Sequence, residues 1–352
     1  MGPPPRMEKA KRLNRKLMKT APTMAPIFKA LPGIPMPIGE ISQQLQDMWK
    51  GDEDSHTAAP SEFRASQLNL VVHFGPGTGV EEAEKIFTTA IEFTQKHPGR
   101  IVVLCPSDDP AKADSLNGKL FTQCYIGESQ REMCCCEALL LEYCPDEPRS
   151  LFNQVSVWVE SDLPVYHWFH KVPLKDVKNK YLGFVKNSKR VLFDSYVETE
   201  NFEEIPTPDS WRIRDLADAR MLPLKQAIGQ ILSPFDPEAI FSGLKDILLL
   251  SDEANLTNAR QLKKWLKQCL AEAEDDGISA CKIRIEDFKS GSESLKIVFE
   301  YDNGQKFEWT MTKNGKYAHT DISLGGRSVR YCMTLRKTDP ESVLTEAIFF
   351  GR

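Results

Sequence analysis

Short apolar runs alternate with amphipathic segments from residue 68 to about residue 197, and this alternation predicts strands separated by helices. Residues 68–74 and 101–106 are mainly apolar, as is typical of strands buried on both faces. Between them, residues 80–97 carry apolar side chains at helical spacing, so the three segments form a βαβ unit with a parallel strand pair. We therefore expect an α/β fold with a Rossmann-like, largely parallel sheet and helices. The same pattern predicts strands at 120–127, 133–144, 163–169 and 190–197, and helices at 151–159 and 175–184.

The last third of the chain has a different pattern. From Ala280, apolar and polar residues alternate with period two, and the Asn-Gly pairs in DNGQ and KNGK predict hairpin turns. We expect a Rossmann-like α/β domain at 65–235 and, at 236–352, a C-terminal α+β domain with an antiparallel sheet. The other elements predicted here are a helical stretch at 211–232, interrupted by Pro223, a strand at 243–250, and helices at 258–274 and 340–347.

The first 64 residues look different from the rest of the chain. They are basic at the start and rich in proline, which is typical of an extension with little core of its own. A short amphipathic helix fits residues 40–51, because Ile41, Leu45 and Met48 fall on one face. We expect residues 1–64 to form a flexible extension.

Composition narrows the class of protein. Of the 352 residues, 41% are hydrophobic and 27% are charged, which allows a sizeable core. The net charge of -5 argues against broad binding of nucleic acid or anionic membranes. The N-terminus lacks the apolar region of a secretory signal, so a cytoplasmic protein is expected. An organelle transit peptide is the alternative, because this stretch is poor in acidic residues.

The cysteines include three neighbours, Cys134, Cys135 and Cys136, among nine in the chain. In a reducing compartment they are expected to be thiols. On a strand, Cys134 and Cys136 share one face, but no second pair with zinc spacing is evident. Buried structural thiols are therefore predicted, with a redox role as the alternative.

A glycine-rich segment, FGPGTGV at 74–80, lies between a predicted strand and a predicted helix, where a dinucleotide fingerprint belongs. The third glycine of that fingerprint would fall on Val80, and Pro76 removes a backbone donor. A plain strand-to-helix turn is the favoured interpretation.

The stretch ESDLPVYHWFHKVP at 160–173 concentrates rings and histidines. On a strand, His167 and His170 point to opposite faces and make a poor metal pair. Trp168 is more typical of a core or an interface than of a cofactor site. Asp162 and Asp194 lie near the ends of predicted parallel strands, where α/β folds build sites, although either can simply cap a loop. No complete catalytic set is evident, so no enzyme activity, cofactor or metal is expected.

Several stretches in the same order resemble one family, the glucose-6-phosphate dehydrogenase assembly protein OpcA. They are HPGRIVVL, CCCEALLLEYC, SDLPVYHWFHKVP, RVLFDS, RIRDLADARMLPLKQAI and QLKKWLKQCL, and the resemblance covers residues 65–300. The chain departs from the family at three positions that carry tryptophan there, namely Phe169, Asp218 and Leu224.

The resemblance implies a non-catalytic partner that binds oligomeric glucose-6-phosphate dehydrogenase and acts as its assembly protein or allosteric activator in the pentose phosphate pathway. Alternatively, the protein is an enzyme or sensor that binds a nucleotide or sugar phosphate near Gly75–Gly79, Asp162 and Asp194. Because rings in exposed loops often anchor interfaces, the partner-binding candidates are Asp162, His167, Trp168, His170, Asp194 and Trp211.

Overall fold

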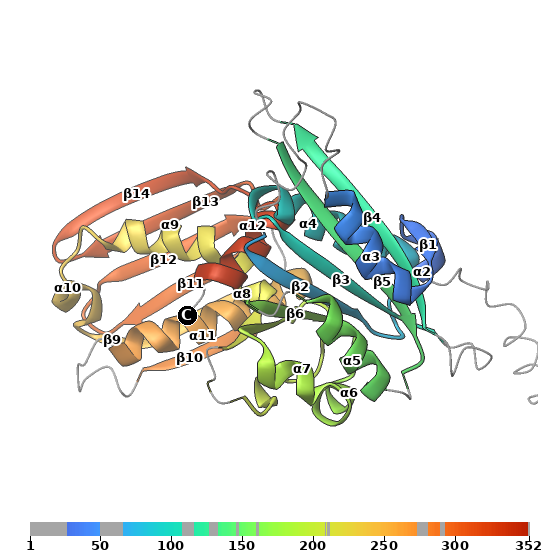
Figure 1. Ribbon diagram of the computed structural model, residues 1–352. Helices are drawn as coiled ribbons and strands as arrows, with labels where there is room; N and C mark the ends of the chain where they lie inside the picture. Colours follow the sequence, from blue (N-terminus) through green and yellow to red (C-terminus); the bar gives the residue numbers. More distant parts are fainter. Residues whose placement is uncertain are drawn as a thin grey trace, which may run out of the picture.

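The computed structural model describes residues 27–49, 66–107, 116–126, 133–145, 148–159, 162–207, 209, 212–272, 281–288 and 293–350. Within these ranges the chain forms two sheets, each packed against helices (Figure 1). No helix among the described residues is long and apolar enough to cross a membrane.

The first sheet has eight strands in the order β1-β4-β5-β3-β2-β6-β7-β8. The six strands from β5 to β8 run parallel, whereas β4 is antiparallel to β5 and β1 is antiparallel to β4. This arrangement confirms the Rossmann-like, largely parallel sheet, and the predicted βαβ unit is present as β2, α4 and β3. The strands are β1 (Ile34–Met36), β2 (Leu68–Phe74), β3 (Gly99–Pro106), β4 (Asn117–Ile126), β5 (Met133–Tyr143), β6 (Val165–His170), β7 (Arg190–Phe193) and β8 (Ile213–Asp215).

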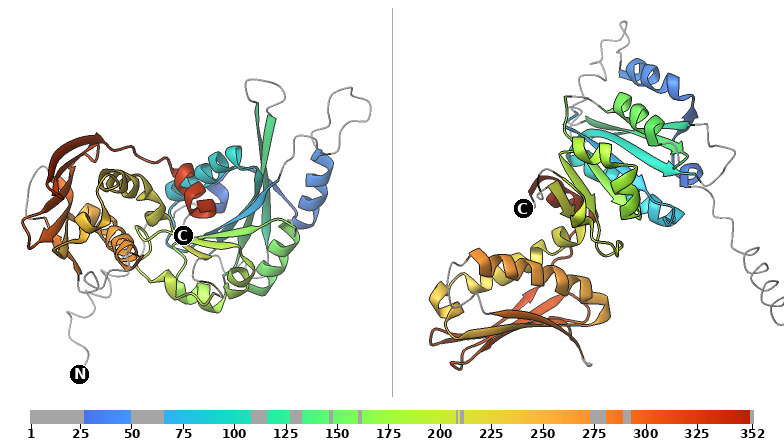
Figure 2. Two further views of the ribbon diagram at one scale, coloured as in Figure 1. Left: turned by 90° about the vertical axis from the view of Figure 1, so that its left-hand side faces the viewer. Right: turned by 90° about the horizontal axis from the view of Figure 1, so that it is seen from below.

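Helices cover both faces of this sheet, as Figure 2 shows. Two apolar cores result, one on each face. One face packs against α2 (Ile27–Ala30), α4 (Val80–Lys96), α8 (Leu216–Arg220), α12 (Pro340–Thr345) and a π-helical turn, η7 (Glu346–Phe350). The other face packs against α3 (Ile38–Trp49), α5 (Pro148–Trp158), α6 (Leu174–Asn179) and α7 (Leu182–Asn187), and a 3-10 turn, η3 (Phe202–Glu204), follows β7. The single helix predicted at 175–184 is therefore two short ones.

The second sheet has six strands in the order β10-β9-β11-β12-β13-β14. All neighbours are antiparallel except β10 and β9, so the predicted antiparallel sheet is largely confirmed. One face packs on helices, and the other carries charged pairs such as Lys296 with Glu308. The elements are α9 (Leu222–Leu232), α10 (Pro237–Phe241), β9 (Leu244–Ser251), η5 (Glu253–Asn255), α11 (Leu256–Glu272), β10 (Lys282–Asp287), β11 (Glu293–Tyr301), β12 (Lys306–Thr312), β13 (Tyr317–Leu324) and β14 (Arg327–Thr334).

Residues 27–49 differ from the flexible extension expected at the N-terminus. Phe28 and Leu31 are buried in the core beside α4, and Ile41 is buried in the core on the opposite face. The ammonium group of Lys119 donates hydrogen bonds to three backbone carbonyls of this segment, including that of Leu31 at 2.8 Å. Burial lowers the pKa of Lys119. The amphipathic helix expected at 40–51 is present as α3, and its apolar face packs in the core.

Residues on each side of the domain boundary predicted at residue 235 pack in the core of the other sheet. Ile228 and Ile231 of α9 lie in the core of the second sheet. Val343, Leu344 and Ile348, near the end of the chain, lie in the core of the first sheet. After the second sheet is complete, the chain packs again on the first sheet. The segment between β14 and α12 thereby forms one side of the site described next.

Candidate functional site

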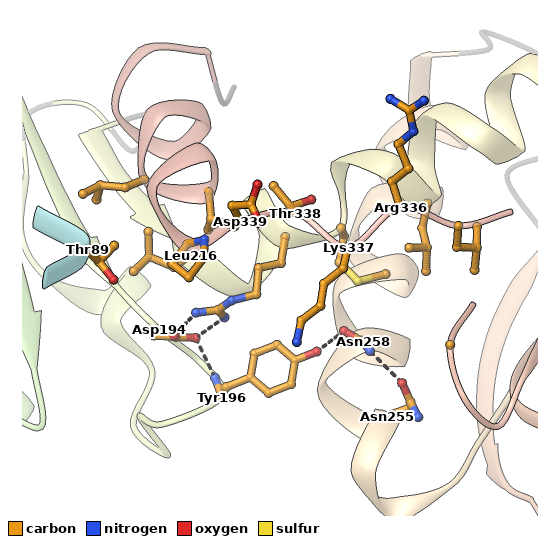
Figure 3. A pocket seen from close by; sticks show the side chains of 18 of the residues that line it. Thr89, Asp194, Tyr196, Leu216, Asn255, Asn258, Arg336, Lys337, Thr338 and Asp339 are labelled. Atoms are coloured by element: carbon orange, nitrogen blue, oxygen red, sulfur yellow. Dashed lines mark hydrogen bonds and ion pairs between the residues drawn. The ribbon is translucent and has the colours of Figure 1, made fainter. Parts of the chain in front are cut away.

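A cavity of about 850 Å³ lies where the carboxyl ends of β6 and β7 meet the β12–β13 turn and the segment between β14 and α12. We refer to it as the intersheet cleft (Figure 3). In doubly wound folds, ligands bind outside the carboxyl ends of the parallel strands. The first sheet and the elements packed on it contribute Trp168, His170, Asp194, Tyr196 and Arg220 to its lining, whereas η5 contributes Asn255 and α11 contributes Asn258.

Asp194 follows the last residue of β7 and is 6% exposed. Its carboxylate accepts hydrogen bonds from both terminal nitrogens of Arg220, at 2.8 Å from Nη1, and another of 3.1 Å from the backbone N–H of Tyr196. The same guanidinium carbon lies 5.1 Å from the centre of the Tyr196 ring, within cation–π range. A bidentate pair of this kind fixes geometry as well as charge. It forms a rigid wall of the intersheet cleft.

A side-chain hydrogen bond joins the two halves of the cleft. The hydroxyl of Tyr196, after β7, donates to Oδ1 of Asn258 on α11 (Figure 3). The amide of Asn258 donates in turn to Oδ1 of Asn255 at 2.8 Å. Burial raises the pKa of Tyr196, so its phenol stays protonated and keeps this donor at neutral pH.

A second set of hydrogen bonds links the loop after β7 to α11. Asp215, the N-cap of α8, accepts hydrogen bonds from the backbone N–H of Ser195 at 3.0 Å and of Ala217 at 2.9 Å. Nε2 of Gln261 on α11 donates to Asp215 at 2.6 Å and to the Ser195 hydroxyl at 3.0 Å. Burial raises the pKa of Asp215. These bonds hold the loop that carries Tyr196 against the second half of the chain.

The carboxyl end of β6 carries a charged cluster. Nε2 of His170 lies 3.0 Å from one oxygen of Glu82, and the ammonium of Lys171 lies 2.6 Å from the other. Burial lowers the pKa of His170, although the charge of Glu82 opposes this shift. Burial alone would raise the pKa of Glu82, but the hydrogen bond from Lys171 and the charge of His170 hold it below its usual value.

Lys171 adopts an unusual backbone conformation, with φ of 55° in the left-handed region. Its N–H donates to Glu198 at 2.6 Å. Burial raises the pKa of Glu198 to about 7, even though this hydrogen bond favours the charged form. The turn after β6 is therefore held by a carboxyl group that titrates near neutral pH.

The glycine-rich segment at 74–80 is a closed turn. A Cβ on Gly75 would lie 1.6 Å from the carbonyl oxygen of Lys171, and the Gly75 N–H donates to the carbonyl of His170 at 2.7 Å. The N-terminus of α4 is already occupied, because the N–H of Gly79 donates to Glu82 at 3.3 Å. This carboxylate stands where a dinucleotide phosphate would bind. The geometry agrees with the plain strand-to-helix turn favoured from the sequence.

His167 lies on the opposite face of β6 from His170, as the strand pattern predicts. Its Nδ1 lies 2.8 Å from Nε2 of His73 in a fully buried pair, and the His73 ring stacks on Phe169 at 4.2 Å. Burial lowers the pKa of His167 to about 3 and that of His73 well below its usual value. Both histidines are neutral core residues at physiological pH.

The other predicted site residues are scattered. Trp168 is 6% exposed and belongs to the core beside α4. Asp162 is exposed, but it precedes β6, whereas Asp194 follows the parallel strand β7. The two aspartates therefore lie at opposite edges of the sheet, so the structure does not bring Asp162 together with Asp194 and Gly75–Gly79. Trp211 lies outside the described residues.

Cys135 is not the buried thiol that the sequence predicted. It forms a disulfide with Cys124, because the register of β4 and β5 places these two residues directly opposite each other. Cys136 is buried and lies outside the disulfide, as predicted, whereas the side chain of Cys134 lies outside the described residues. Within the described ranges, no three His, Cys, Asp or Glu side chains are grouped so as to hold a metal ion.

Sequence reasoning missed the second half of the intersheet cleft. Lys316 comes from the β12–β13 turn, and Arg336, Lys337 and Thr338 come from the segment before α12. The KNGK hairpin was predicted from the sequence, but nothing local indicates that its Lys316 meets the loop after β7. Long-range packing, of α12 against α4 and α8 and of α11 against α8, brings these residues together.

A comparison with known protein families identifies a match within the first-sheet part of the chain. Residues 90–207 match the sequence profile of the family described as the glucose-6-phosphate dehydrogenase subunit N-terminal domain. The resemblance to the OpcA family is thereby confirmed over this segment. No curated protein matches the chain. Among solved structures, the chain is similar to glucose-6-phosphate 1-dehydrogenase from Mycobacterium avium, with a TM-score of 0.41 and 9% sequence identity over 80% of this chain and 87% of that chain.

Proposed function

Because residues 90–207 carry a segment of the OpcA family, we propose that this protein is a non-catalytic assembly protein and allosteric activator of glucose-6-phosphate dehydrogenase. In this role it binds the oligomeric enzyme in the cytoplasm, at the entry to the pentose phosphate pathway. The family match is the observation that carries the proposal. The six stretches that resemble the family, which occur in its order along the chain, support it.

The burial of the predicted anchors limits where the enzyme can dock. Three predicted anchors, His167, Trp168 and His170, are each at most 6% exposed. They therefore stabilise the fold and offer little surface to a partner. In the family-matched segment, Val157 on α5 is 68% exposed and Asp162 is exposed in the turn that follows. We propose Val157 and Asp162 as contacts for the dehydrogenase, since interfaces bury apolar side chains at their centre and place charged ones at their polar rim.

Mixing the protein with glucose-6-phosphate dehydrogenase from the same cell tests this proposal. The protein alone should turn over no sugar phosphate, whereas its addition should raise dehydrogenase activity and increase the sedimentation coefficient of the enzyme. Val157→Asp should weaken the complex by about 2 kcal/mol if Val157 is a central contact. Ile34→Asp is the matched control, because Ile34 is 70% exposed and lies outside the matched segment.

Two results would overturn the proposal. One is unchanged activity and unchanged sedimentation across a range of protein and salt concentrations. The other is turnover of sugar phosphate by this protein in the absence of the dehydrogenase. Equal weakening by Val157→Asp and Ile34→Asp would move the docking surface away from α5.

A further inference from the structure

The intersheet cleft is positively charged in a protein whose net charge is -5. Five Lys or Arg side chains and two Asp side chains line it. Arg220 and Asp194 neutralise each other, which leaves four cations and a single carboxylate, Asp339. Such an excess of one charge in a concave site raises the local concentration of ligands of the opposite charge. The cleft is therefore suited to an anion.

Lys337 is the cation best placed to hold that anion. Figure 3 shows its side chain extending into the cleft toward Tyr196 and Asn258, whereas Arg336 extends away from them. Lys337 is exposed, and no ion pair joins it to another residue of the described ranges. Lys316 and Lys85 line the same cleft from the β12–β13 turn and from α4. A multiply charged group such as a phosphate can be neutralised by several cations of this kind.

The uncharged groups of the cleft suit hydroxyl groups. Asn258, Asn255 and Thr89 line its walls; Asn258 and Asn255 are hydrogen-bonded to each other, and the Thr89 hydroxyl donates to the carbonyl of Lys85. Trp168 and Thr338 also line the cleft, and the indole Nε1 of Trp168 and the hydroxyl of Thr338 are buried without a hydrogen-bond partner within the described residues. Buried polar groups without partners are costly, so a ligand oxygen that reached them would be stabilised. The volume of about 850 Å³ falls within the usual range for small-molecule pockets.

We propose that the intersheet cleft binds a small phosphorylated polyol, of the size of a hexose phosphate. Lys337, together with Lys316, neutralises the phosphate, and Tyr196 and Asn258 contact the hydroxyl groups. The ligand thereby touches both halves of the chain, because Tyr196 follows β7 and Lys337 follows β14. This site lies at the carboxyl edge of the same sheet as the Gly75–Gly79 turn but is formed by different residues.

Calorimetric titration of the full chain with a hexose 6-phosphate, in the absence of any dehydrogenase, tests this site. The unphosphorylated hexose should bind at least about tenfold more weakly, and inorganic phosphate should compete with the hexose phosphate. Lys337→Glu should weaken binding by about tenfold or more, because it replaces an attraction with a repulsion. Asn258→Ala should weaken binding of the hexose phosphate while leaving that of inorganic phosphate unchanged.

Lys175→Glu is the matched control, since Lys175 is an exposed lysine on α6, outside the cleft. It makes the same change in net charge and should leave the affinity within about twofold. Circular dichroism should be the same for all variants, and Lys316→Glu provides a second test if Lys337→Glu fails to fold. Absence of binding, or equal weakening by Lys175→Glu and Lys337→Glu, would overturn the site. Either result would leave the proposed partnership with the dehydrogenase untouched, because the enzyme is absent from the titration.

Discussion

Two places at the carboxyl edge of the first sheet invite comparison, the turn at Gly75–Gly79 and the intersheet cleft. The turn follows the central strand β2 and carries the glycine-rich pattern that nucleotide sites use. It is closed, because the backbones at Gly75 and Lys171 touch and Glu82 occupies the start of α4. The cleft lies beside β6 and β7, has no sequence signature, and is open and cationic.

The difference shows what each kind of site requires. A phosphate-binding turn depends on a few neighbouring backbone groups, so one close contact and one carboxylate are enough to remove it. The cleft depends on side chains from seven separate segments, and it exists because the end of the chain packs back on α4. In this protein the long-range arrangement, rather than the local motif, creates the space for a ligand.

The largest expected loss of stability comes from adding a side chain at Gly75 in the closed turn. Gly75→Val should lower the free energy of unfolding by about 4 kcal/mol or more, because its Cβ cannot fit 1.6 Å from the Lys171 oxygen without moving the backbone. Gly77→Ala is the control, since the nearest atom to its Cβ would be 3.9 Å away. Urea denaturation of both variants measures the difference. Similar stability of the two variants would show that the turn is not closed.

The buried histidine pair behind the turn should make the protein sensitive to acid. The pKa values of His73 and His167 lie below that of an unfolded histidine, so below pH 6.5 the unfolded state binds more protons. Stability should therefore fall as the pH drops from 6.5 toward 3, with His167 alone contributing about 2 kcal/mol between neutral pH and about pH 5 and His73 adding to the loss. Urea midpoints across this range provide the measurement.

In the same titration, His167→Asn should give a shallower loss of stability with acid. His319→Asn should leave the slope unchanged, because His319 is exposed on β13. Identical slopes for the wild-type protein and His167→Asn would contradict the assignment of this pair as neutral core residues.

A smaller effect is expected at the wall of the cleft. Asp194→Asn should cost about 1.5 kcal/mol of stability, because it removes the charge that pairs with Arg220 on both terminal nitrogens. Asp209→Asn is a matched control, since the Asp209–Arg212 pair is more exposed and should contribute at most about 0.5 kcal/mol. Thermal unfolding of the two variants separates them, and equal midpoints would mean that the wall is not rigid.

The smallest effect should come from the link between the two halves. Tyr196→Phe removes the hydrogen bond to Asn258 and should lower stability by about 0.5–1 kcal/mol. Tyr317→Phe, at a tyrosine of similar exposure on β13, should change nothing measurable. If Tyr196→Phe is equally silent in urea denaturation, the link does not hold the cleft together.

The sequence predicted the local elements well because their signals are local. The strand at 68–74 matches β2, the alternation after Ala280 matches the second sheet, and the Asn-Gly turns lie between its strands. The burial of Trp168 also follows from its place in a run of rings. These features depend on periodicity and turn chemistry, which neighbouring residues encode.

The cleft and the disulfide could not be predicted in this way. Cys124 meets Cys135 only because of the register between β4 and β5, and nothing in either segment alone specifies that register. Tyr196, Asn258 and Lys337 meet through tertiary packing, although Tyr196 and Lys337 are separated by 141 positions in the sequence. The packing of the N-terminal segment has the same cause, since Phe28 and Leu31 are buried in the core beside α4 and the carbonyl of Leu31 accepts a hydrogen bond from the distant Lys119.

Hydrogen exchange with and without saturating hexose 6-phosphate most directly tests the claim that the intersheet cleft, and not the glycine-rich turn, is the ligand site. The structure predicts slower exchange of backbone amides at residues 194–198, 255–258 and 335–338, which surround the cleft, and no change at 75–79. Protection confined to residues 75–79, or no protection in any of these segments, would contradict it.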